Sequence, residues 1–373
     1  MTGPARIALA AGGTGGHMFP AEALASELLA RGHAVALVTD RRGGGFGNKL
    51  PAVELHRISA GGLTGTGIVG RAQGVVQLGL GFFQARALLG RIAPAVAVGF
   101  GGYASVPTVF AASLSGVPTV LHEQNAVLGR ANRLLAKRAT RIATSFAKVV
   151  GVGAADRVVL TGNPVRPAVA ALADEAYLPI LPEGEIRLLV VGGSQGARVF
   201  GRLVPEAIAA LPEGLRRRLR LVQQVRAEDL DSVRATYAGQ NTSAELAPFF
   251  SDIPQRLRVA HLVIARAGAS TVAELTAAGR PAILVPFPFA TDDHQTANAR
   301  AIEAAGGAWL MPEASTQPSA LAERLTSLLG DATALMRASD AARQQGRRDA
   351  AARLADVVTS LIRSNGSSRK EAA

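Results

Sequence analysis

Short apolar runs rich in valine, isoleucine and leucine alternate with segments of helical periodicity along the whole chain. Seven of these runs predict β-strands, at residues 6–11, 34–39, 95–100, 118–123, 187–192, 261–266 and 281–286. Strands that lack polar alternation and are separated by helices are typical of parallel sheets covered by helices on both faces. The sequence therefore predicts an α/β fold.

The order strand, glycine-rich turn, helix occurs early in the chain and again far downstream, with GGTGGH at 12–17 and GGSQGA at 192–197. A chain of 373 residues has the length of two domains. We therefore expect two Rossmann-like, doubly wound parallel-sheet domains, residues 1–163 and 164–340, that face each other across a cleft. A final helix at 341–363 is expected to pack back on the first domain.

The charge of the chain points to an anionic partner. Lysine and arginine number 40 against 28 acidic residues, a net charge of +12, which favours nucleic acid, phospholipid headgroups or phosphorylated substrates. Aromatic residues make up only 4% of the chain, too few for a base-stacking surface, so we expect no nucleic acid. The chain has no cysteine, which excludes disulfides and thiolate metal sites, and its start lacks the features of a signal peptide. These features indicate a cytoplasmic protein.

Glycine-rich loops follow three of the predicted strands, at 12–16, 99–105 and 192–197. A loop from a strand into a helix offers free backbone N–H groups and the positive end of the helix dipole. Glycine lets a phosphate or a sugar approach the main chain closely. The three loops together therefore predict binding of a phosphorylated ligand.

The glycine loops match the common nucleotide and hydrolase motifs poorly. The dinucleotide fingerprint lacks its third glycine, since Gly13 and Gly15 are followed by Met18, although Asp40 ends the second strand where a ribose-binding acid is found. A dehydrogenase that uses Asp40 stays open as an alternative. GGSQG fits the hydrolase elbow, but its acid and histidine would be the adjacent residues at 292–294, and adjacent residues rarely form such a relay.

A series of longer motifs resembles one known family. These motifs are GGTGGHMFPA, GFGGYAS, LHEQNAVLGRANRLLA, GNPVR, GGSQGA, ARAGASTVAEL and HQTANA. In order and approximate spacing they are similar to those of the peptidoglycan N-acetylglucosaminyltransferases, which are family 28 glycosyltransferases of the two-Rossmann-domain (GT-B) type. The similarity runs from about residue 6 to about residue 310.

The resemblance implies a reaction and a location. GlcNAc would pass from UDP-GlcNAc to the 4-hydroxyl of MurNAc in lipid I, the undecaprenyl-pyrophosphoryl-MurNAc-pentapeptide, giving lipid II and UDP with inversion at the anomeric carbon and without a cofactor. The enzyme would be a peripheral protein on the cytoplasmic side of the inner membrane, in the cell-wall biogenesis on which cell shape and division depend. Another GT-B transferase with a different donor or acceptor stays open, and so does a non-catalytic sugar-nucleotide binding module.

His17 is the candidate general base of the first domain. An inverting transfer needs a group that takes the proton of the acceptor hydroxyl, and imidazole titrates near neutral pH. A place at a helix N-terminus favours the uncharged imidazole that a base requires. The alternative is a helix-start histidine that bonds only to backbone. Thr14, Gly15 and Gly16 are expected to meet a donor or acceptor phosphate through main chain and hydroxyl.

Further site residues follow from the resemblance. Asn125 corresponds to a substrate-binding position of the family, although a turn residue is the alternative there. Ser194 and the N–H groups of 193–197 would hold the diphosphate, with Arg166 adding a fixed positive charge unless it is a surface ion-pair partner. The main chain of Phe250 would read the uracil, while its side chain belongs equally well to a core.

The nucleoside pocket is assigned to the segment 269–274. Its residues are Ala269, Ser270, Thr271, Val272, Ala273 and Glu274. In the family, a glutamate at the position of Glu274 accepts hydrogen bonds from both ribose hydroxyls. The sequence TVAE is also a capping box, in which Glu274 would only return to the backbone of Thr271. Gln295, with Asn298 on the same helix face, would bind the hydroxyls of the donor sugar, the alternative being helix capping.

No metal site is predicted. Asp229 and Asp231 match the Asp-x-Asp pattern of metal-dependent transferases, but they lie in the charged helical stretch RAEDLDSVRA, which indicates a solvated face.

An uncharged, largely apolar segment at 72–85 lies between Arg71 and Arg86. It is shorter than the about 20 apolar residues that a transmembrane helix needs. Two interpretations remain. It is an ordinary buried helix, or it is an amphipathic surface that enters the headgroup region of an anionic membrane, where basic residues flank it. The basic residues of that second interpretation are Arg71, Arg86, Arg91, Arg133, Lys137 and Arg138.

Overall fold

The structure is a computed structural model that describes residues 4–12, 15–40, 50–61, 67–153, 155–194 and 196–370. The chain divides into two compact units. The first unit consists of Met1–Val165 with Asp349–Ala373, and the second of Arg166–Arg348. The boundary expected between 163 and 164 lies two residues from the observed one.

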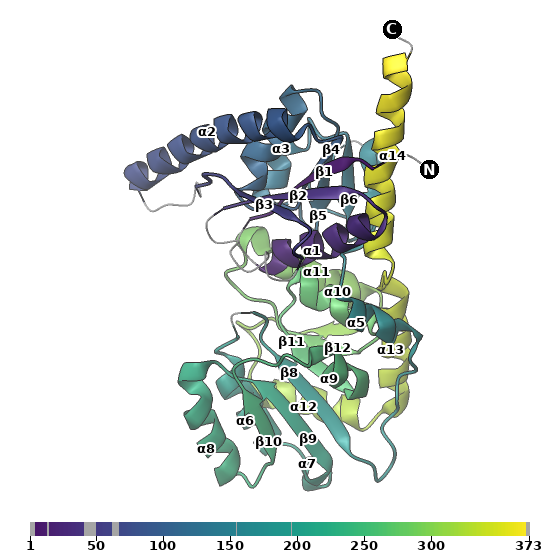
Figure 1. Ribbon diagram of the computed structural model, residues 1–373. Coiled ribbons are helices and arrows are strands. Elements are labelled where there is room, and N and C mark those ends of the chain that lie inside the picture. Colours follow the sequence, from purple (N-terminus) through teal and green to yellow (C-terminus); the bar gives the residue numbers. More distant parts are fainter. Residues whose placement is uncertain are drawn as a thin grey trace. The chain divides into compact units, whose positions relative to one another are not determined.

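The first unit is built on a parallel sheet of seven strands in the order β3-β2-β1-β4-β5-β6-β7 (Figure 1). Its strands are β1 (Arg6–Ala10), β2 (Ala34–Thr39), β3 (Glu54–Arg57), β4 (Val96–Gly99), β5 (Thr119–Glu123), β6 (Arg141–Thr144) and β7 (Val158–Leu160). Its helices are α1 (Gly15–Ala30), α2 (Gly67–Ile92), α3 (Ser105–Leu114), α4 (Arg130–Leu135) and α14 (Ala350–Lys370), with a short 3-10 turn, η1 (Ala155–Arg157).

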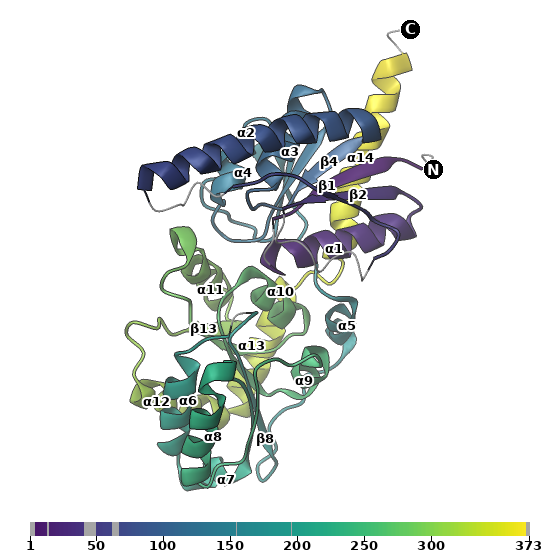
Figure 2. The same cartoon turned by 60° about the vertical axis from the view of Figure 1, so that its left-hand side comes forward.

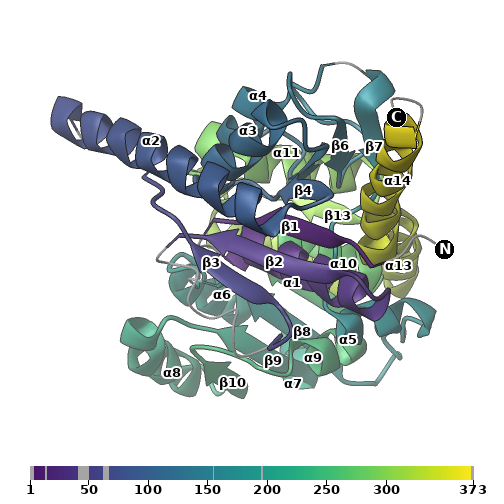
Figure 3. The ribbon, with the colours of Figure 1, turned by 45° about the horizontal axis from the view of Figure 1, so that its top comes forward.

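Helices cover both faces of this sheet, as a parallel sheet requires. On one face, Leu24 of α1 and Leu354 of α14 share a core with Leu9 of β1. On the other face, Leu88 of α2 and Ala111 of α3 pack against the sheet (Figure 3). Apolar side chains thus point from both faces of the sheet into a core, which explains why the strands do not alternate apolar and polar residues.

The second unit repeats this plan with a parallel sheet of six strands in the order β10-β9-β8-β11-β12-β13. Its strands are β8 (Ile186–Val191), β9 (Leu219–Gln224), β10 (Ala244–Ala247), β11 (Leu262–Ala265), β12 (Ala282–Leu284) and β13 (Ala308–Leu310). Its longer helices are α6 (Phe200–Ala209), α8 (Leu230–Gly239), α10 (Ala269–Ala277), α11 (His294–Ala304), α12 (Pro318–Leu329) and α13 (Ala332–Gln345). Its shorter ones are α5 (Pro167–Ala170), η2 (Ala171–Asp174), α7 (Glu213–Arg218), η3 (Ala227–Asp229), α9 (Ile253–Val259) and η4 (Thr291–Asp293).

The helices α6, α8 and α12 gather on one face of the second sheet (Figure 2), where their apolar residues form one core with β8 and β9. The predicted α/β class with two Rossmann-like units is therefore confirmed. All seven predicted runs form strands. Six further strands were not predicted, namely β3, β6, β7, β9, β10 and β13. Two of the missed strands, β3 and β10, are sheet edges that carry glutamate.

The expectation of a single helix at 341–363 is wrong. The structure has two helices there, because α13 ends at Gln345 and α14 begins at Ala350. The backbone turns extended at Gly346, with ψ 145°. A Cβ at Gly346 would lie 2.5 Å from the carbonyl oxygen of Thr276, so this close approach to α10 accepts only glycine. The chain crosses from the second unit back to the first at this break, and α14 packs on α1.

Candidate active site

The glycine loops lie where the strand order of each sheet reverses. In the first unit, β1 continues into α1 on one face and its neighbour β4 continues toward α3 on the other. In the second unit, the neighbours β8 and β11 lead to α6 and α10. In open α/β sheets, ligands bind at such switch points, beyond the carboxyl ends of the strands. Each unit therefore has one candidate site of its own.

Two glycine loops of the first unit touch each other through their main chains. Gly12 N donates to the carbonyl oxygen of Gly101 at 3.2 Å. A Cβ on Gly12 would lie 2.9 Å from the Cα of Gly102, and Gly102 has a φ of +74°. Part of the glycine content is thus a packing requirement. Gly15 and Gly16 begin α1 next to this contact, whereas Thr14 lies outside the described residues.

His17, in the first turn of α1, is held by tertiary contacts. A Cβ built on Gly101 would be 3.1 Å from the ring carbon Cε1 of His17, so the imidazole lies directly on this glycine. Its Nδ1 is 3.3 Å from Oε1 of Gln124, which follows β5. The loop after β4 and the end of β5 therefore fix the position of the ring.

The residues after β5 form a buried polar network that the sequence indicated only in part. Glu123 is buried, and its carboxylate accepts hydrogen bonds from Gly129 N at 2.8 Å and Asn132 Nδ2 at 2.9 Å. The backbone N and the side-chain amide of Asn125 also donate to it, at 3.0 and 3.3 Å. Glu123 thus shapes the turn that presents Asn125, which is half-buried.

His122 is fully buried, and burial lowers its pKa to about 4. It is therefore neutral near pH 7. Its Nε2 lies 3.0 Å from the carbonyl oxygen of Gly162 and its Nδ1 lies 2.9 Å from Nε2 of Gln124. Gln124 was not predicted as a site residue, although a polar residue after an apolar strand and beside glycine loops was a usable signal.

The glycine loop of the second unit is held by a glutamine as well. Gln224, at the end of β9, accepts from Gly192 N and donates to the carbonyl oxygen of Gly193, both at 3.0 Å. Gly193 and Gly196 have positive φ values of 82° and 69°. Ser194 is exposed on this loop. Gln224 was not predicted from the sequence either.

The predicted capping box of α10 is wrong. The helix begins at Ala269 with Gly268 as its N-cap, and no side chain caps it. Thr271 is therefore the third residue of the helix, and Glu274 is not part of a cap with it. Ser270 lies in the first turn, and its buried Oγ has no hydrogen-bond partner among the described residues. The first turn of α10 thus combines free backbone N–H groups with an unsatisfied hydroxyl.

Glu274 is paired with Arg166. The arginine donates from Nε to Oε1 at 2.7 Å and from a terminal nitrogen to Oε2 at 2.9 Å. Both residues belong to the second unit, and the ion pair expected as the alternative for Arg166 is present. The pair leaves the carboxylate further acceptor positions, since each oxygen has two lone pairs.

Gln295 and Asn298 differ in their surroundings. Gln295 is half-buried in the first turn of α11, and its Oε1 accepts from Phe287 N at 3.0 Å. Asn298 is fully buried, and its amide donates to the carbonyl oxygen of Ala267 at 3.0 Å. The expectation that both amides face a sugar is wrong for Asn298, which holds the loop before α10. Asp293 precedes α11 with a φ of 51° and makes no side-chain cap.

The side chain of Phe250 is buried, and the guanidinium of Arg256 lies over its ring at 4.1 Å from the centroid. The core interpretation therefore holds for this side chain. Its main chain lies in the middle of the loop 248–252, between β10 and α9.

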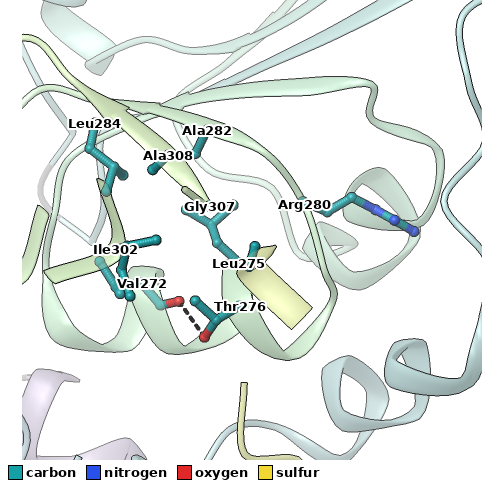
Figure 4. A pocket seen from close by; sticks show the side chains of 10 residues that line it. Val272, Leu275, Thr276, Arg280, Ala282, Leu284, Ile302, Gly307 and Ala308 are labelled. Carbon is teal, nitrogen blue, oxygen red and sulfur yellow. Dashed lines mark hydrogen bonds between the residues drawn. The ribbon is translucent and has the colours of Figure 1, made fainter. Parts of the chain in front are cut away.

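A small cavity lies behind α10, between this helix and β12 and β13 (Figure 4). Its volume is about 10 Å³, and Val272, Leu275 and Ile302 line it. Thr276 points toward it, with its hydroxyl donating to the carbonyl oxygen of Val272 at 2.9 Å. A space of this size holds about one water molecule, so it is a packing gap and not a nucleotide site.

Asp229 and Asp231 have arginine neighbours. Asp231 pairs with Arg234 at 2.7 Å on α8, and Arg198 lies 3.9 Å from Asp229. Among the residues described, no group of three or more histidine or acidic side chains is placed to hold a metal ion.

The helix α2 is neither wholly buried nor long and apolar enough to span a membrane, and no other helix in the described part of the chain spans one. Val76, Leu80 and Phe83 recur at i, i+4 and i+7 and are 60, 53 and 68% exposed. We call these three residues the α2 stripe. The interpretation as an ordinary buried helix is wrong for this face.

Basic residues lie beside the α2 stripe. Arg86 and Arg91 are exposed on α2 itself, and Arg133, Lys137 and Arg138 are exposed on α4 and the turn after it. Phe110 of α3 joins the two groups, because its ring contacts Phe82 at 5.6 Å and lies 5.3 Å under the guanidinium of Arg138. The side chain of Arg71 lies outside the described residues.

Comparisons with known proteins agree with this architecture. Residues 7–144 match the glycosyltransferase family 28 N-terminal domain, and residues 187–354 match the family 28 C-terminal domain. The first match lies within the first unit, and the second covers most of the second unit and ends at the start of α14.

Several similar relatives carry the same name. A UDP-N-acetylglucosamine–N-acetylmuramyl-(pentapeptide) pyrophosphoryl-undecaprenol N-acetylglucosamine transferase of Paramagnetospirillum magneticum is 59% identical over 358 residues, 95% of this chain and 96% of the relative. A relative of that name from Rhodospirillum centenum is 60% identical over 356 residues, 95% of this chain and 94% of the relative. The crystal structure of Acinetobacter baumannii MurG has a TM-score of 0.79 at 28% identity and covers 96% of this chain and 100% of its own. The chain therefore belongs to glycosyltransferase family 28.

Proposed function

We propose that the protein transfers GlcNAc from UDP-GlcNAc to the 4-hydroxyl of MurNAc in lipid I, with inversion at the anomeric carbon, and so produces lipid II and UDP. The observation that carries this proposal is identity of 59 to 60% along 95% of the chain to relatives named for this transfer. Two switch-point sites with glycine loops, one in each unit, suit a reaction that joins two phosphorylated substrates.

The second unit binds the donor in this proposal. The N–H groups of the loop at 192–197 and the exposed hydroxyl of Ser194 hold the diphosphate, with Arg166 supplying positive charge. Glu274, already oriented by Arg166, accepts from the ribose hydroxyls. The unsatisfied hydroxyl of Ser270 and the N–H groups of the first turn of α10 complete the nucleoside pocket. Its residues are Ala269, Ser270, Thr271, Val272, Ala273 and Glu274.

The remaining donor contacts come from two other loops. The main chain of Phe250 reads the uracil. Its side chain is buried against the guanidinium of Arg256 and takes no part. Gln295 binds a hydroxyl of the GlcNAc, since its Nε2 group is available for donation while its Oε1 accepts from Phe287 N.

The first unit binds the acceptor. His17 takes the proton of the 4-hydroxyl as general base, and the backbone N–H groups at the start of α1, from Gly15 and Gly16, meet the pyrophosphate together with Thr14. Asn125, presented by the turn that Glu123 shapes, binds the acceptor sugar.

The α2 stripe brings the first unit to its lipid-linked acceptor. Its exposed apolar side chains enter the headgroup region on the cytoplasmic face of the inner membrane, and the exposed arginines and lysine beside it meet anionic lipid. The protein is then a peripheral membrane enzyme of cell-wall biogenesis, on which cell shape and division depend.

A ligand-binding experiment separates this function from the dehydrogenase that Asp40 suggested. UDP and UDP-GlcNAc are expected to raise the melting temperature of the protein in proportion to the logarithm of their concentration, because only ligands of the native state stabilise it. NAD is expected to leave it unchanged. Stabilisation by NAD and none by UDP would refute the proposed donor.

A further inference from the structure

The amide of Gln124 has only one chemically possible orientation. Its Nε2 lies 2.9 Å from the carbonyl oxygen of Phe100 and 3.1 Å from that of His122. Carbonyl oxygens only accept hydrogen bonds, so the NH2 end of the amide must face them. The oxygen Oε1 must therefore face the other way, toward Nδ1 of His17.

The ring of His122 supports this orientation. Its Nε2 faces the carbonyl oxygen of Gly162 at 3.0 Å and must carry the proton that donates to it. In the neutral ring the Nδ1 atom is then an acceptor, and it lies 2.9 Å from Nε2 of Gln124. The buried carbonyl oxygens of Gly162, Phe100 and His122 thus leave Gln124 no second arrangement.

The tautomer of His17 follows from this network. Oε1 of Gln124 is an acceptor only, so the Nδ1 atom of His17 that faces it must be the protonated nitrogen. We propose that Gln124 is a positioning residue that holds neutral His17 in its Nδ1–H tautomer, and that the contact of Gln124 with His122 and Phe100 fixes this orientation. The Nε2 atom of His17 then carries the lone pair.

The consequence for catalysis rests on the proposed function. The Nε2 lone pair of His17 takes the proton of the acceptor 4-hydroxyl while the hydroxyl oxygen bonds to the anomeric carbon of GlcNAc. The bond from that carbon to the diphosphate breaks, and UDP leaves with the electron pair. The imidazolium keeps its Nδ1–H bond to Gln124 and later loses the Nε2 proton to solvent. The other tautomer would present a proton to the hydroxyl and could not act as base.

The amide of Gln124 orients the ring of His17 without placing a negative charge beside it. In the Ser-His-Asp triad a buried carboxylate holds the histidine in its tautomer and also stabilises the imidazolium. Here the adjacent carboxylate, Glu123, is committed elsewhere, since it accepts from Asn125, Gly129 and Asn132. Gln124 therefore orients His17 through a neutral amide oxygen.

The loop GFGGYAS contacts both Gln124 and His17. The carbonyl oxygen of Phe100 orients Gln124, and the imidazole of His17 lies directly on Gly101, which has a φ of +88°. A side chain on Gly101 would displace the ring from Oε1 of Gln124. One loop thus fixes both partners of the hydrogen bond.

The test reads the tautomer directly, with protein labelled by ¹⁵N only in its six histidines. Nitrogen chemical shifts distinguish a protonated from a bare ring nitrogen, and His17→Ala identifies the signals of His17. In the wild type near neutral pH, we expect Nδ1 of His17 to be protonated and Nε2 to be bare. A protonated Nε2 and bare Nδ1 would overturn the proposal without any variant of Gln124.

The variant Gln124→Met keeps the size of the side chain and removes the acceptor. We expect loss of the Nδ1–H preference and a fall in kcat of at least about 10-fold, with the affinity for UDP unchanged. The matched control is Gln223→Met, which removes a buried glutamine of the second unit that bonds to Phe200 and Tyr237, and it should leave the His17 signals unchanged.

The outcomes separate the two proposals. An unchanged Nδ1–H signal in Gln124→Met would show that Gln124 does not set the tautomer. The expected tautomers together with no transfer by the wild type would refute the proposed function and leave the positioning role standing.

Discussion

Arg166 and Glu274 are joined by two parallel hydrogen bonds, of 2.7 and 2.9 Å, between one guanidinium and both oxygens of one carboxylate. Arg166 is the N-cap of α5 and Glu274 lies in α10, so the pair ties two helices of the second unit together. Bidentate pairs fix the plane of a carboxylate. Glu274 is thereby oriented before any nucleotide binds, with acceptor capacity remaining on each oxygen.

We expect Glu274→Gln to weaken UDP binding by about 10- to 100-fold, because hydrogen bonds to a charged acceptor contribute about 1.5–3 kcal/mol. The measurement is calorimetry with UDP and with 2′-deoxy-UDP. Wild-type protein should prefer UDP, and the variant should lose most of this preference. Glu175→Gln is the control, since both carboxylate oxygens of Glu175 also accept from an arginine of the same unit, here from the single Nε of Arg258. An equal preference in wild type and Glu274→Gln would contradict the ribose assignment.

The sequence was sufficient for features that repeat or that depend on apolar pattern. Seven strands, the two-unit plan and the glycine loops all follow from it, because parallel strands buried on both faces have few polar residues. It was insufficient where a residue's role depends on which atoms face it. The orientation of Gln124 is set by the carbonyl oxygen of Phe100, which approaches from another segment, and by that of His122, two residues earlier.

Local rules also failed where tertiary packing overrides them. TVAE satisfies a capping box with Thr271 as the N-cap, yet the N-cap of α10 is Gly268, three residues earlier, and Glu274 bonds to Arg166 instead. The Arg/Ala-rich stretch 341–363 concealed a break at Gly346, where the main chain of Thr276 lies too close for a side chain. Neither contact is visible in a window of neighbouring residues.

The contact between the two glycine loops of the first unit predicts a stability difference between two identical substitutions. Gly12→Ala places a methyl group 2.9 Å from the Cα of Gly102 and should destabilise the unit by about 1–3 kcal/mol. Gly90→Ala, on an exposed helical position with no atom within 4 Å, should stabilise it by about 0.5–1 kcal/mol. Urea unfolding measures both. Equal stability of Gly12→Ala and wild type would contradict the observed loop contact.

The α2 stripe predicts loss of membrane binding when its apolar side chains are removed. The triple variant with Val76, Leu80 and Phe83 changed to serine should bind phosphatidylglycerol vesicles at least about 100-fold more weakly, since each buried apolar side chain contributes about 1.5–3 kcal/mol. Co-sedimentation with vesicles measures this.

The matched control for the α2 stripe lies in the second unit. Leu178 and Leu181 are 52 and 64% exposed, and changing both to serine should leave vesicle binding intact. Added salt should weaken wild-type binding, because it screens the basic residues beside the stripe. Full binding by the triple variant would exclude the stripe as the membrane contact.

The buried His122 predicts a loss of stability in mild acid. Burial lowers its pKa from 6.5 to about 4, so between these values the unfolded chain binds more protons than the folded one. Its contribution is complete above pH 6.5 and falls as the pH drops, by about 2 kcal/mol at pH 5. Hydrogen exchange of the β5 amides at pH 7 and pH 5 measures it. The fall should shrink in His122→Phe; a fall of the same size in that variant would assign it to other groups.

The most direct measurement is transfer itself, with radiolabelled UDP-GlcNAc and a short-chain lipid I analogue. We expect wild-type protein to form a labelled disaccharide lipid, and His17→Ala to form it about 100- to 10,000-fold more slowly while binding UDP normally. Turnover of His17→Ala close to wild type would refute the base assignment. No labelled product from folded, UDP-binding wild type would contradict the proposed function.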